Sequence, residues 1–246
     1  MRAGRLRTIA IVLRSVAVTL AITIPTIFEV YRGTYRRSDG DRRLRWWSQK
    51  LLSFVDLRLD VFHSGNAAMP PGRPVMLMSN HSSLYDIPLI FAALPGSIRM
   101  LTKKELFRVP IWGRGLTAGE FVSIDRSDLD RAIHDLAAAR DKMIDGIVLW
   151  VAPEGTRSRD GTIGSFKKGG FMVALETGAM IVPIGIRGAR DVLPAKTLAF
   201  ELGRTAEVHI GEPIDAAAYR GERGRLMADV DRRIRELAAV SAVRSS

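Results

Sequence analysis

The chain has 246 residues, no cysteine and a net charge of +11. A chain of this length can bury one large core, or a core with a small appendage. The lack of cysteine excludes disulfides, thiolate catalysis and cysteine-ligated metal sites.

Most of the basic excess lies at the N-terminus. Residues 1–50 hold eleven Arg and Lys against Glu29, Asp39 and Asp41, a net of +8, which leaves +3 for the rest of the chain. No basic patch interleaved with aromatic residues follows, so nucleic acid is not an expected partner. Anionic lipid headgroups explain this distribution of charge better.

The N-terminal region predicts a pair of helices associated with a membrane. Residues 8–28 are largely apolar, interrupted by Arg14 and Pro25, and a second apolar segment with two tryptophans covers residues 44–57. Arginines on both sides of the first segment favour a helical hairpin in one leaflet. A single span is the alternative, and a buried core helix is a weaker one. In either membrane arrangement the heavier positive flank places the remainder of the chain on the cytoplasmic side of the cell membrane.

From residue 57 onward, short apolar runs alternate with amphipathic stretches. The predicted strands are residues 58–63, 75–79, 97–102, 120–124, 147–151, 181–186 and 206–210. The predicted helices are residues 86–93, 129–145, 169–177 and 223–239. Strands separated by helices indicate an α/β fold, with a largely parallel mixed sheet flanked by helices.

The segment Asn80-His81-Ser82-Ser83-Leu84-Tyr85-Asp86 follows a predicted buried strand. Five positions on a helix turn through about 500°, so His81 and Asp86 cannot share a helix face. We therefore expect His81 in the turn after the strand and Asp86 in the first turn of the next helix, with Ser83 or Asp86 as its cap. The Asp86 carboxylate can then bond one imidazole nitrogen and leave the other as a base. The alternative is that Asp86 is only a helix cap and His81 only a turn residue.

A second polar segment, Pro153-Glu154-Gly155-Thr156-Arg157, follows the strand predicted at 147–151. Open α/β sheets bind ligands at this carboxyl edge. Gly155 lets a ligand approach the backbone, and Arg157 can hold a phosphate through two parallel hydrogen bonds. Glu154 can orient that arginine or accept a hydrogen bond from a substrate hydroxyl. An ordinary polar turn with an internal ion pair is the alternative.

Two further segments, residues 103–126 and 182–187, contain candidate site residues. Lys103 ends one predicted strand and Arg126 follows the next, so both can complete a phosphate cradle. Pro183 weakens regular pairing within residues 182–187, and either shapes a pocket wall or marks an edge or bulge. We interpret three charged side chains mainly as surface charges: Arg159, Lys167 and Lys168. The histidines outside the first segment are scattered without ligand spacing, so no metal site is expected: His63, His134 and His209.

Four segments in this order and spacing resemble the glycerolipid acyltransferase family, specifically the bacterial 1-acylglycerol-3-phosphate acyltransferases. They are residues 80–86, 103–126, 153–157 and 182–187, and the resemblance covers roughly residues 55–215. The N-terminal helical pair is also similar to that of bacterial members. One departure is Val151-Ala152, where the family commonly has an aromatic residue before the proline.

The resemblance implies a general base, His81, and an orienting partner, Asp86. It implies direct attack of a lysophospholipid hydroxyl on an acyl thioester, with no acyl-enzyme and no cofactor beyond acyl-CoA or acyl-carrier protein as co-substrate. The product would be phosphatidic acid from 1-acylglycerol 3-phosphate. The residues implied to bind the phosphate and glycerol are Lys103, Arg126, Glu154, Gly155, Thr156 and Arg157.

The implied organisation is an anchoring region, residues 1–56, that keeps the cleft of an acyltransferase catalytic domain, residues 57–246, beside the bilayer. Another lyso-lipid, such as lyso-ornithine lipid, is an alternative acceptor. A lipase or thioesterase is a less favoured alternative, as is a non-catalytic lipid-binding protein on the same fold.

Overall fold

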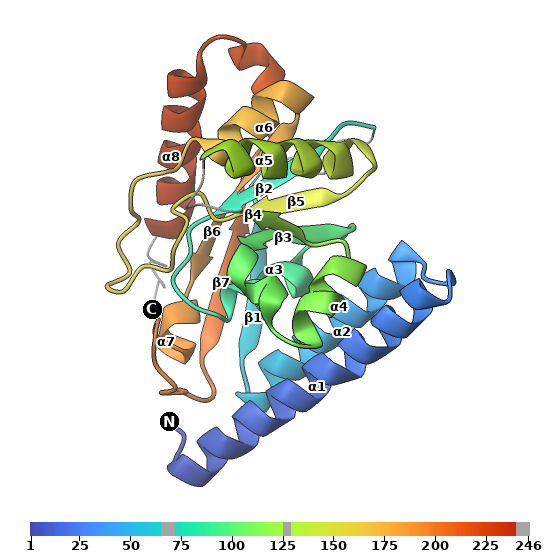
Figure 1. Cartoon of the computed structure of the whole chain (residues 1–246). Coiled ribbons are helices and arrows are strands. Elements are labelled where there is room, and N and C mark those ends of the chain that lie inside the picture. The colour runs from blue at the N-terminus through green and yellow to red at the C-terminus, as the bar shows by residue number, and fades with distance from the viewer. Residues whose placement is uncertain (65–71, 125–128, 240–246) are drawn as a thin grey trace.

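An eight-stranded, largely parallel sheet forms the centre of the computed structural model, which describes residues 1–64, 72–124 and 129–239 (Figure 1). The strands are β1 Arg58–His63, β2 Val75–Ser79, β3 Ile98–Lys103, β4 Val122–Ile124, β5 Val148–Val151, β6 Met180–Arg187, β7 Thr205–Ile210 and β8 Ile214–Asp215. Their order is β1-β7-β6-β2-β5-β3-β4, with β8 also paired to β6. Among the strands of the described residues, only the pairs of β6 with β7 and β8 are antiparallel, so the predicted mixed α/β sheet is confirmed.

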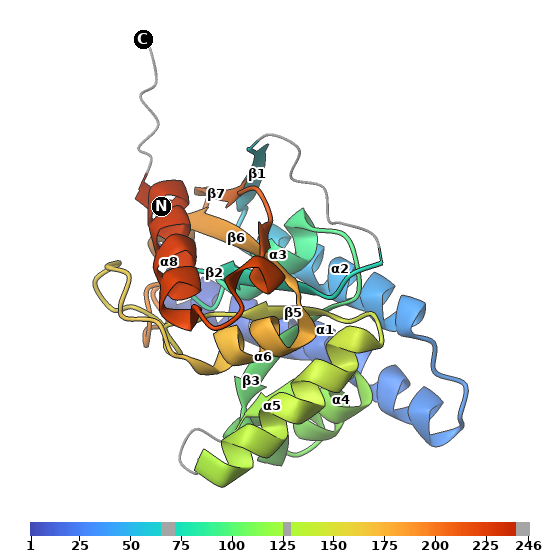
Figure 2. The same cartoon turned by 90° about the horizontal axis from the view of Figure 1, so that it is seen from above.

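Helices cover both faces of this sheet (Figure 2). They are α1 Arg5–Tyr31, α2 Arg37–Phe54, α3 Asp86–Ala93, α4 Trp112–Ala118, α5 Leu129–Ile144, α6 Gly169–Thr177, α7 Ala189–Val192 and α8 Arg223–Ala239, with 3₁₀ turns η1 Lys104–Arg108 and η2 Ala216–Tyr219. One hydrophobic core contains side chains of α1, α2 and α3, and a second contains side chains of α5, α6 and α8. The elements that sequence patterns did not predict, α4, α7, β8 and the 3₁₀ turns, are too short to show a period.

The N-terminal helices form an antiparallel hairpin packed against the rest of the chain. The indole N–H of Trp47 donates to Thr19 Oγ1 at 3.0 Å. Arg43 pairs with Glu29 nearer the connection between the two helices. By length and composition α1 is able to cross a membrane, a test that core helices and signal sequences also pass. Its outer face carries exposed apolar side chains: Leu6, Ile9, Leu13, Val16, Ile24 and Phe28. The second helix begins at residue 37, earlier than the predicted apolar segment, because its first turns carry arginines that find carboxylate partners.

Ion pairs join this hairpin to the rest of the molecule. Arg37 of α2 donates two hydrogen bonds of 2.8 Å to the Glu120 carboxylate and also pairs with Asp145. Arg99 of β3 is fully buried, and its guanidinium bonds Asp41 Oδ1 of α2 at 2.7 Å. The helical pair therefore shares both an apolar core and ion pairs with the remainder of the molecule.

Strand β6 lies inside the sheet, so the expectation that Pro183 marks an edge is wrong. On one side β6 pairs with β8 up to Ile181 and with β7 from Ile184 onward. Pro183 falls between these two pairings, where its missing N–H interrupts neither ladder. A Cβ on Gly185 would lie 2.3 Å from the carbonyl carbon of Leu237, so only glycine lets α8 approach this strand.

Candidate active site

His81 and Asp86 meet at the junction of β2 and α3. His81 Nδ1 lies 2.7 Å from Asp86 Oδ2, the Asp86 side chain is fully buried, and the imidazole is 15% exposed. The same carboxylate oxygen accepts the backbone N–H groups of Ser82 and Ser83 at 2.7 and 2.8 Å. The predicted strand–turn–helix geometry is confirmed, and it leaves the imidazole Nε2 as the nitrogen that faces away from Asp86.

The predicted side-chain cap of α3 is wrong. Tyr85 stands at the N-cap position, and no side chain among the described residues caps the helix. Asp86 instead turns its carboxylate back to the preceding loop, because that loop presents two backbone N–H groups and the imidazole. Ser83 Oγ donates to the Leu193 carbonyl at 2.8 Å and accepts the Tyr85 N–H at 3.1 Å.

Asn80 fixes this turn to the neighbouring strand. Its amide nitrogen donates to the Ile186 carbonyl at 2.9 Å, and its amide oxygen accepts the Ile186 N–H at 2.8 Å. The buried side chain thus pairs with β6 as another strand would. Sequence reasoning missed this role, because the partner lies 106 residues away along the chain.

Glu154 fixes the same turn from the other side. Its Oε1 accepts the His81 N–H at 2.9 Å, and its Oε2 accepts the Gly164 N–H at 2.9 Å. The Ser158 N–H also donates to the His81 carbonyl at 2.8 Å. Burial raises the pKa of the Glu154 carboxyl above its ordinary value. The two carboxylate oxygens contact backbone groups, so the internal ion pair of a simple polar turn, Glu154 with Arg157, is not formed among the described residues.

A groove of about 490 Å³ lies beside this junction. Arg157, half-buried, and the exposed Thr156 line it, next to Gly155 with its positive φ of 75°. The structure adds three basic side chains to its walls: Arg159, Lys167 and Lys196. Two of these were interpreted as surface charges, and the third follows α7, far away in sequence, so no local pattern could have assigned them. Among the described residues Arg157 has no carboxylate partner, which leaves its guanidinium available to an anion.

The structure does not bring every predicted cation into this groove. Lys103 ends β3 and is exposed, but β5 lies between β3 and the strand that precedes His81, and Lys103 does not line the groove. Arg126 lies outside the described residues. Of the predicted phosphate cradle, the structure therefore assembles the part contributed by residues 154–157.

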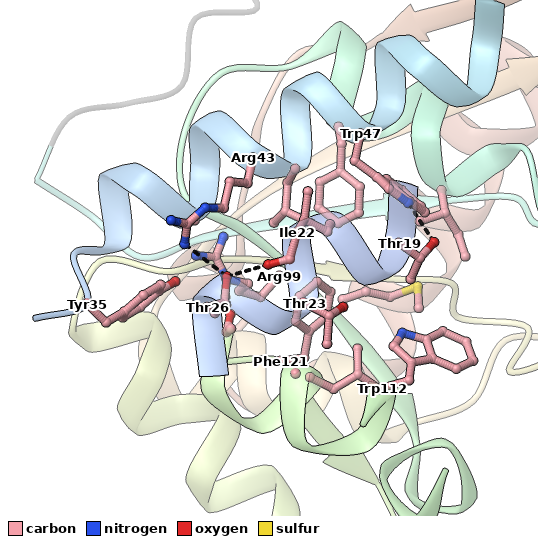
Figure 3. A pocket seen from close by; sticks show the side chains of 18 residues that line it. Thr19, Ile22, Thr23, Thr26, Tyr35, Arg43, Trp47, Arg99, Trp112 and Phe121 are labelled. Atoms are coloured by element: carbon pink, nitrogen blue, oxygen red, sulfur yellow. Dashed lines mark hydrogen bonds between the residues drawn. The ribbon is translucent and has the colours of Figure 1, made fainter. Parts of the chain in front are cut away.

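A second, apolar pocket of about 110 Å³ lies between the helical pair, α4 and β3 (Figure 3). Thr19 and Thr23 of α1, Trp47 of α2, Trp112 of α4 and Phe121 form much of its wall. Its opposite end is polar: Tyr35, Arg43 and Arg99. The pocket draws on several elements, so sequence reasoning did not identify it.

Aromatic rings connect the two sites. Trp150 of β5 contacts the His81 ring edge-to-face at a centroid distance of 6.2 Å, and it contacts Phe91 in the same way at 6.4 Å. Phe91 also lines the apolar pocket. The Trp150 N–H donates to Ser79 Oγ at 3.0 Å, which fixes the indole beneath the turn.

The chemistry available here is activation of a hydroxyl group. A carboxylate-oriented imidazole is a general base, and a cationic groove beside it can hold an anionic part of the same substrate. The chain has no cysteine, and its sequence contains no Gly-x-Ser-x-Gly nucleophile elbow. Fold and site together define a class of enzymes that transfer a group to a hydroxyl.

Comparisons with known proteins specify the group that is transferred. The family model for acyltransferases matches residues 60–187, more than half of the chain. A chloroplastic 1-acyl-sn-glycerol-3-phosphate acyltransferase of Arabidopsis thaliana is 33% identical over 141 residues, which cover 57% of this chain and 39% of the plant chain. The human 1-acyl-sn-glycerol-3-phosphate acyltransferase alpha is 30% identical over 159 residues, or 64% of this chain and 55% of the human one. The matched part is thus less than two thirds of either relative.

A solved structure matches almost the whole chain. The crystal structure of the 1-acyl-sn-glycerophosphate acyltransferase PlsC from Thermotoga maritima aligns with a TM-score of 0.71 and 27% identity, over 96% of this chain and 99% of that one. This chain belongs to the acyltransferase family.

Proposed function

We propose that this protein transfers an acyl chain from acyl-CoA or acyl-carrier protein to the free hydroxyl of 1-acylglycerol 3-phosphate, forming phosphatidic acid. The observation that carries the proposal is the His81–Asp86 pair, with its 2.7 Å hydrogen bond, beside a groove lined by Arg157, which has no carboxylate partner in the described part of the chain. The relatives named above are 1-acylglycerol-3-phosphate acyltransferases and support the choice of acceptor.

In the proposed reaction His81 Nε2 removes the proton of the acceptor hydroxyl while its oxygen attacks the thioester carbonyl. Asp86 keeps the imidazole in the required tautomer and stabilises the imidazolium that forms. The tetrahedral intermediate then expels the thiolate, which takes the proton back from His81. No step needs a covalent acyl-enzyme or a metal.

The acceptor phosphate binds in the groove. Arg157 offers two parallel N–H groups to it, and the positive potential of Lys167 and Lys196 adds to its affinity. Gly155 and Thr156 contact the glycerol part. Glu154 acts through the backbone of His81. Lys103 and Arg126, which the family resemblance implies in phosphate binding, would add positive charge for the acceptor.

The apolar pocket suits a fatty chain, and the outer face of α1 suits a lipid leaflet. Both features support a position of the active site at a membrane surface. The arginines that flank α1 favour a catalytic part on the cytoplasmic side. Acceptor and product, both lipids, then never need to leave the bilayer.

Purified protein assayed against a panel of lyso-lipids with both donor types tests the proposal. We expect turnover of 1-acylglycerol 3-phosphate and a loss of roughly 10²–10⁴-fold in rate for His81→Ala, the usual scale for a general base. His209→Ala is the matched control, because His209 also bonds a carboxylate, Glu207, at 2.8 Å but lies on β7. Turnover of a lyso-lipid without phosphate and none of 1-acylglycerol 3-phosphate would reject the acceptor. Unchanged acyl transfer by His81→Ala would reject the mechanism.

A further inference from the structure

The segment that joins η1 to α4, from the last residue of η1 to the first of α4 (residues 108–112), is exposed and largely apolar. We call it the 108–112 loop. Every residue in it is exposed, and the large apolar side chains Val109, Ile111 and Trp112 are 39%, 47% and 39% exposed. Three such side chains within four positions, with a proline between them, form a compact apolar tip on the surface.

The backbone of this loop is held in an unusual conformation. Ile111 has φ 63° and ψ −58°, a region that β-branched residues rarely adopt. Short hydrogen bonds on both sides maintain it: Trp112 N–H to the Pro110 carbonyl at 2.7 Å and Gly113 N–H to the Val109 carbonyl at 2.8 Å. An exposed apolar residue that is fixed in a strained conformation gains nothing for the core, which suggests a role outside it.

Three cationic side chains lie close to this tip along the chain. Lys103, Arg108 and Arg114 are exposed, and within the described part of the chain none of them has a carboxylate partner. Apolar and tryptophan side chains ringed by Lys and Arg are the pattern that binds an anionic lipid surface, where the apolar groups enter the headgroup layer and the cations meet phosphate.

The loop also continues the apolar face of α1. Helix α4 packs directly on α1, so closely that a Cβ on Gly115 would lie 2.3 Å from Thr23 Cγ2. Thr23 lies two helical turns after Val16 and shares its side of α1. Val16 is exposed on the outer face of that helix. Helix α4, which follows the loop, lies beside α1 (Figure 1), so the exposed stripe of α1 leads toward the 108–112 loop.

We propose that the 108–112 loop is a second membrane contact, which inserts Val109, Ile111 and Trp112 into an anionic leaflet beside α1. The proposal rests on the proposed function only in that both need a lipid surface. This contact would attach the catalytic part to the bilayer independently of α1, on the side of the helical pair that faces the sheet. Trp112 also lines the apolar pocket, so the contact brings one wall of that pocket to the lipid (Figure 3).

A matched pair of substitutions tests this contact in the full-length protein. Ile111→Asp and Ile144→Asp make the same chemical change at exposed isoleucines, 47% and 66% exposed, but Ile144 lies at the end of α5. With vesicles of phosphatidylcholine and phosphatidylglycerol in a 3:1 ratio, we expect Ile111→Asp to weaken binding roughly tenfold and Ile144→Asp to leave it unchanged. Equal affinities for the two variants, both folded by thermal melting, would overturn the proposal.

A spectroscopic measurement keeps the test independent of folding. Brominated lipids quench tryptophan only at close range, so Trp112→Phe should lose a clear part of the quenching that the wild type shows on vesicles. Quenching that is identical in the two proteins would overturn the proposal as well.

Acyl transfer to acceptor dispersed in detergent separates this inference from the proposed function. Ile111→Asp should retain wild-type turnover there, whereas a wild type inactive on every lyso-lipid defeats the proposed function and leaves the vesicle result standing.

Discussion

The backbone N–H of His81 donates a 2.9 Å hydrogen bond to Glu154 Oε1. The Glu154 side chain, in the loop after β5, therefore fixes the turn after β2 that carries the base. The other oxygen of that carboxylate holds Gly164. Glu154 therefore joins the turn of the base to the loop that encloses the groove.

Glu154→Gln tests this junction. The amide keeps the shape but only its oxygen can accept, so one buried backbone N–H loses its partner. We expect a loss of about 1–3 kcal/mol in the free energy of unfolding, and a fall in kcat. Denaturant unfolding and steady-state kinetics measure the two effects. A variant as stable and active as the wild type would show that the junction has no such role.

Asp86→Asn tests the orientation of the base. Asparagine can present its N–H₂ group to His81 and select the wrong imidazole tautomer, so we expect kcat to fall roughly 10²–10⁴-fold. Glu207→Gln, which alters the carboxylate bonded to His209, is the matched control and should retain activity. Comparable kinetics for the two variants would contradict the assignment of Asp86.

Arg157→Gln tests the groove. Loss of a two-point contact with phosphate weakens binding in the ground state, so KM for the acceptor should rise roughly 10–100-fold with a smaller change in kcat. Lys168→Gln removes a positive charge that does not line the groove and should leave KM unchanged. An effect of the same size from both variants would mean that general charge, not this site, binds the acceptor.

The local part of this site was predictable from sequence, and the long-range part was not. His81 and Asp86 are five positions apart, so helix geometry alone places one in the turn and the other in the helix. Asn80 and Glu154 act through partners 106 and 73 residues away, and no local pattern encodes those distances. The strands were predictable because apolar runs alternate with helices, whereas a fully buried Arg99 contradicts ordinary expectations for a charged residue.

The pairing of Arg37 with Glu120 predicts a dependence of stability on pH. The Arg37 guanidinium holds the pKa of Glu120 below its ordinary value of 4.5. A carboxyl group whose pKa is lower in the folded protein stabilises the fold at pH values above its pKa in the unfolded chain. That contribution disappears as the pH falls through the pKa of the group in the folded protein. Glu120→Gln should therefore lower Tm at pH 7, and the difference from wild type should shrink below about pH 4.5. Asp141→Asn, at an exposed pair with Arg140, should show little difference at either pH. A Glu120→Gln difference that persists unchanged at low pH would contradict the electrostatic explanation.

Substitutions at two nearby residues of α1 distinguish membrane anchoring from folding. Leu13 is 64% exposed and Ile11 is 2% exposed, so Leu13→Asp should release the protein from membranes without changing Tm. Ile11→Asp places a charge in the core and should lower the free energy of unfolding by about 5 kcal/mol or more. Membrane fractionation and thermal melting distinguish them. A Leu13→Asp protein that stays fully bound would point to another surface as the main anchor.

Strand β6 connects distant parts of the chain. At Ile186 it holds the amide of Asn80 and thus the turn of the base. One residue later, Arg187 Nε donates to the Leu237 carbonyl at 2.9 Å, while Gly185 lets the same helix lie against the strand. The end of α8 and the turn that carries His81 are therefore attached to two consecutive residues of β6, although they lie far apart along the sequence.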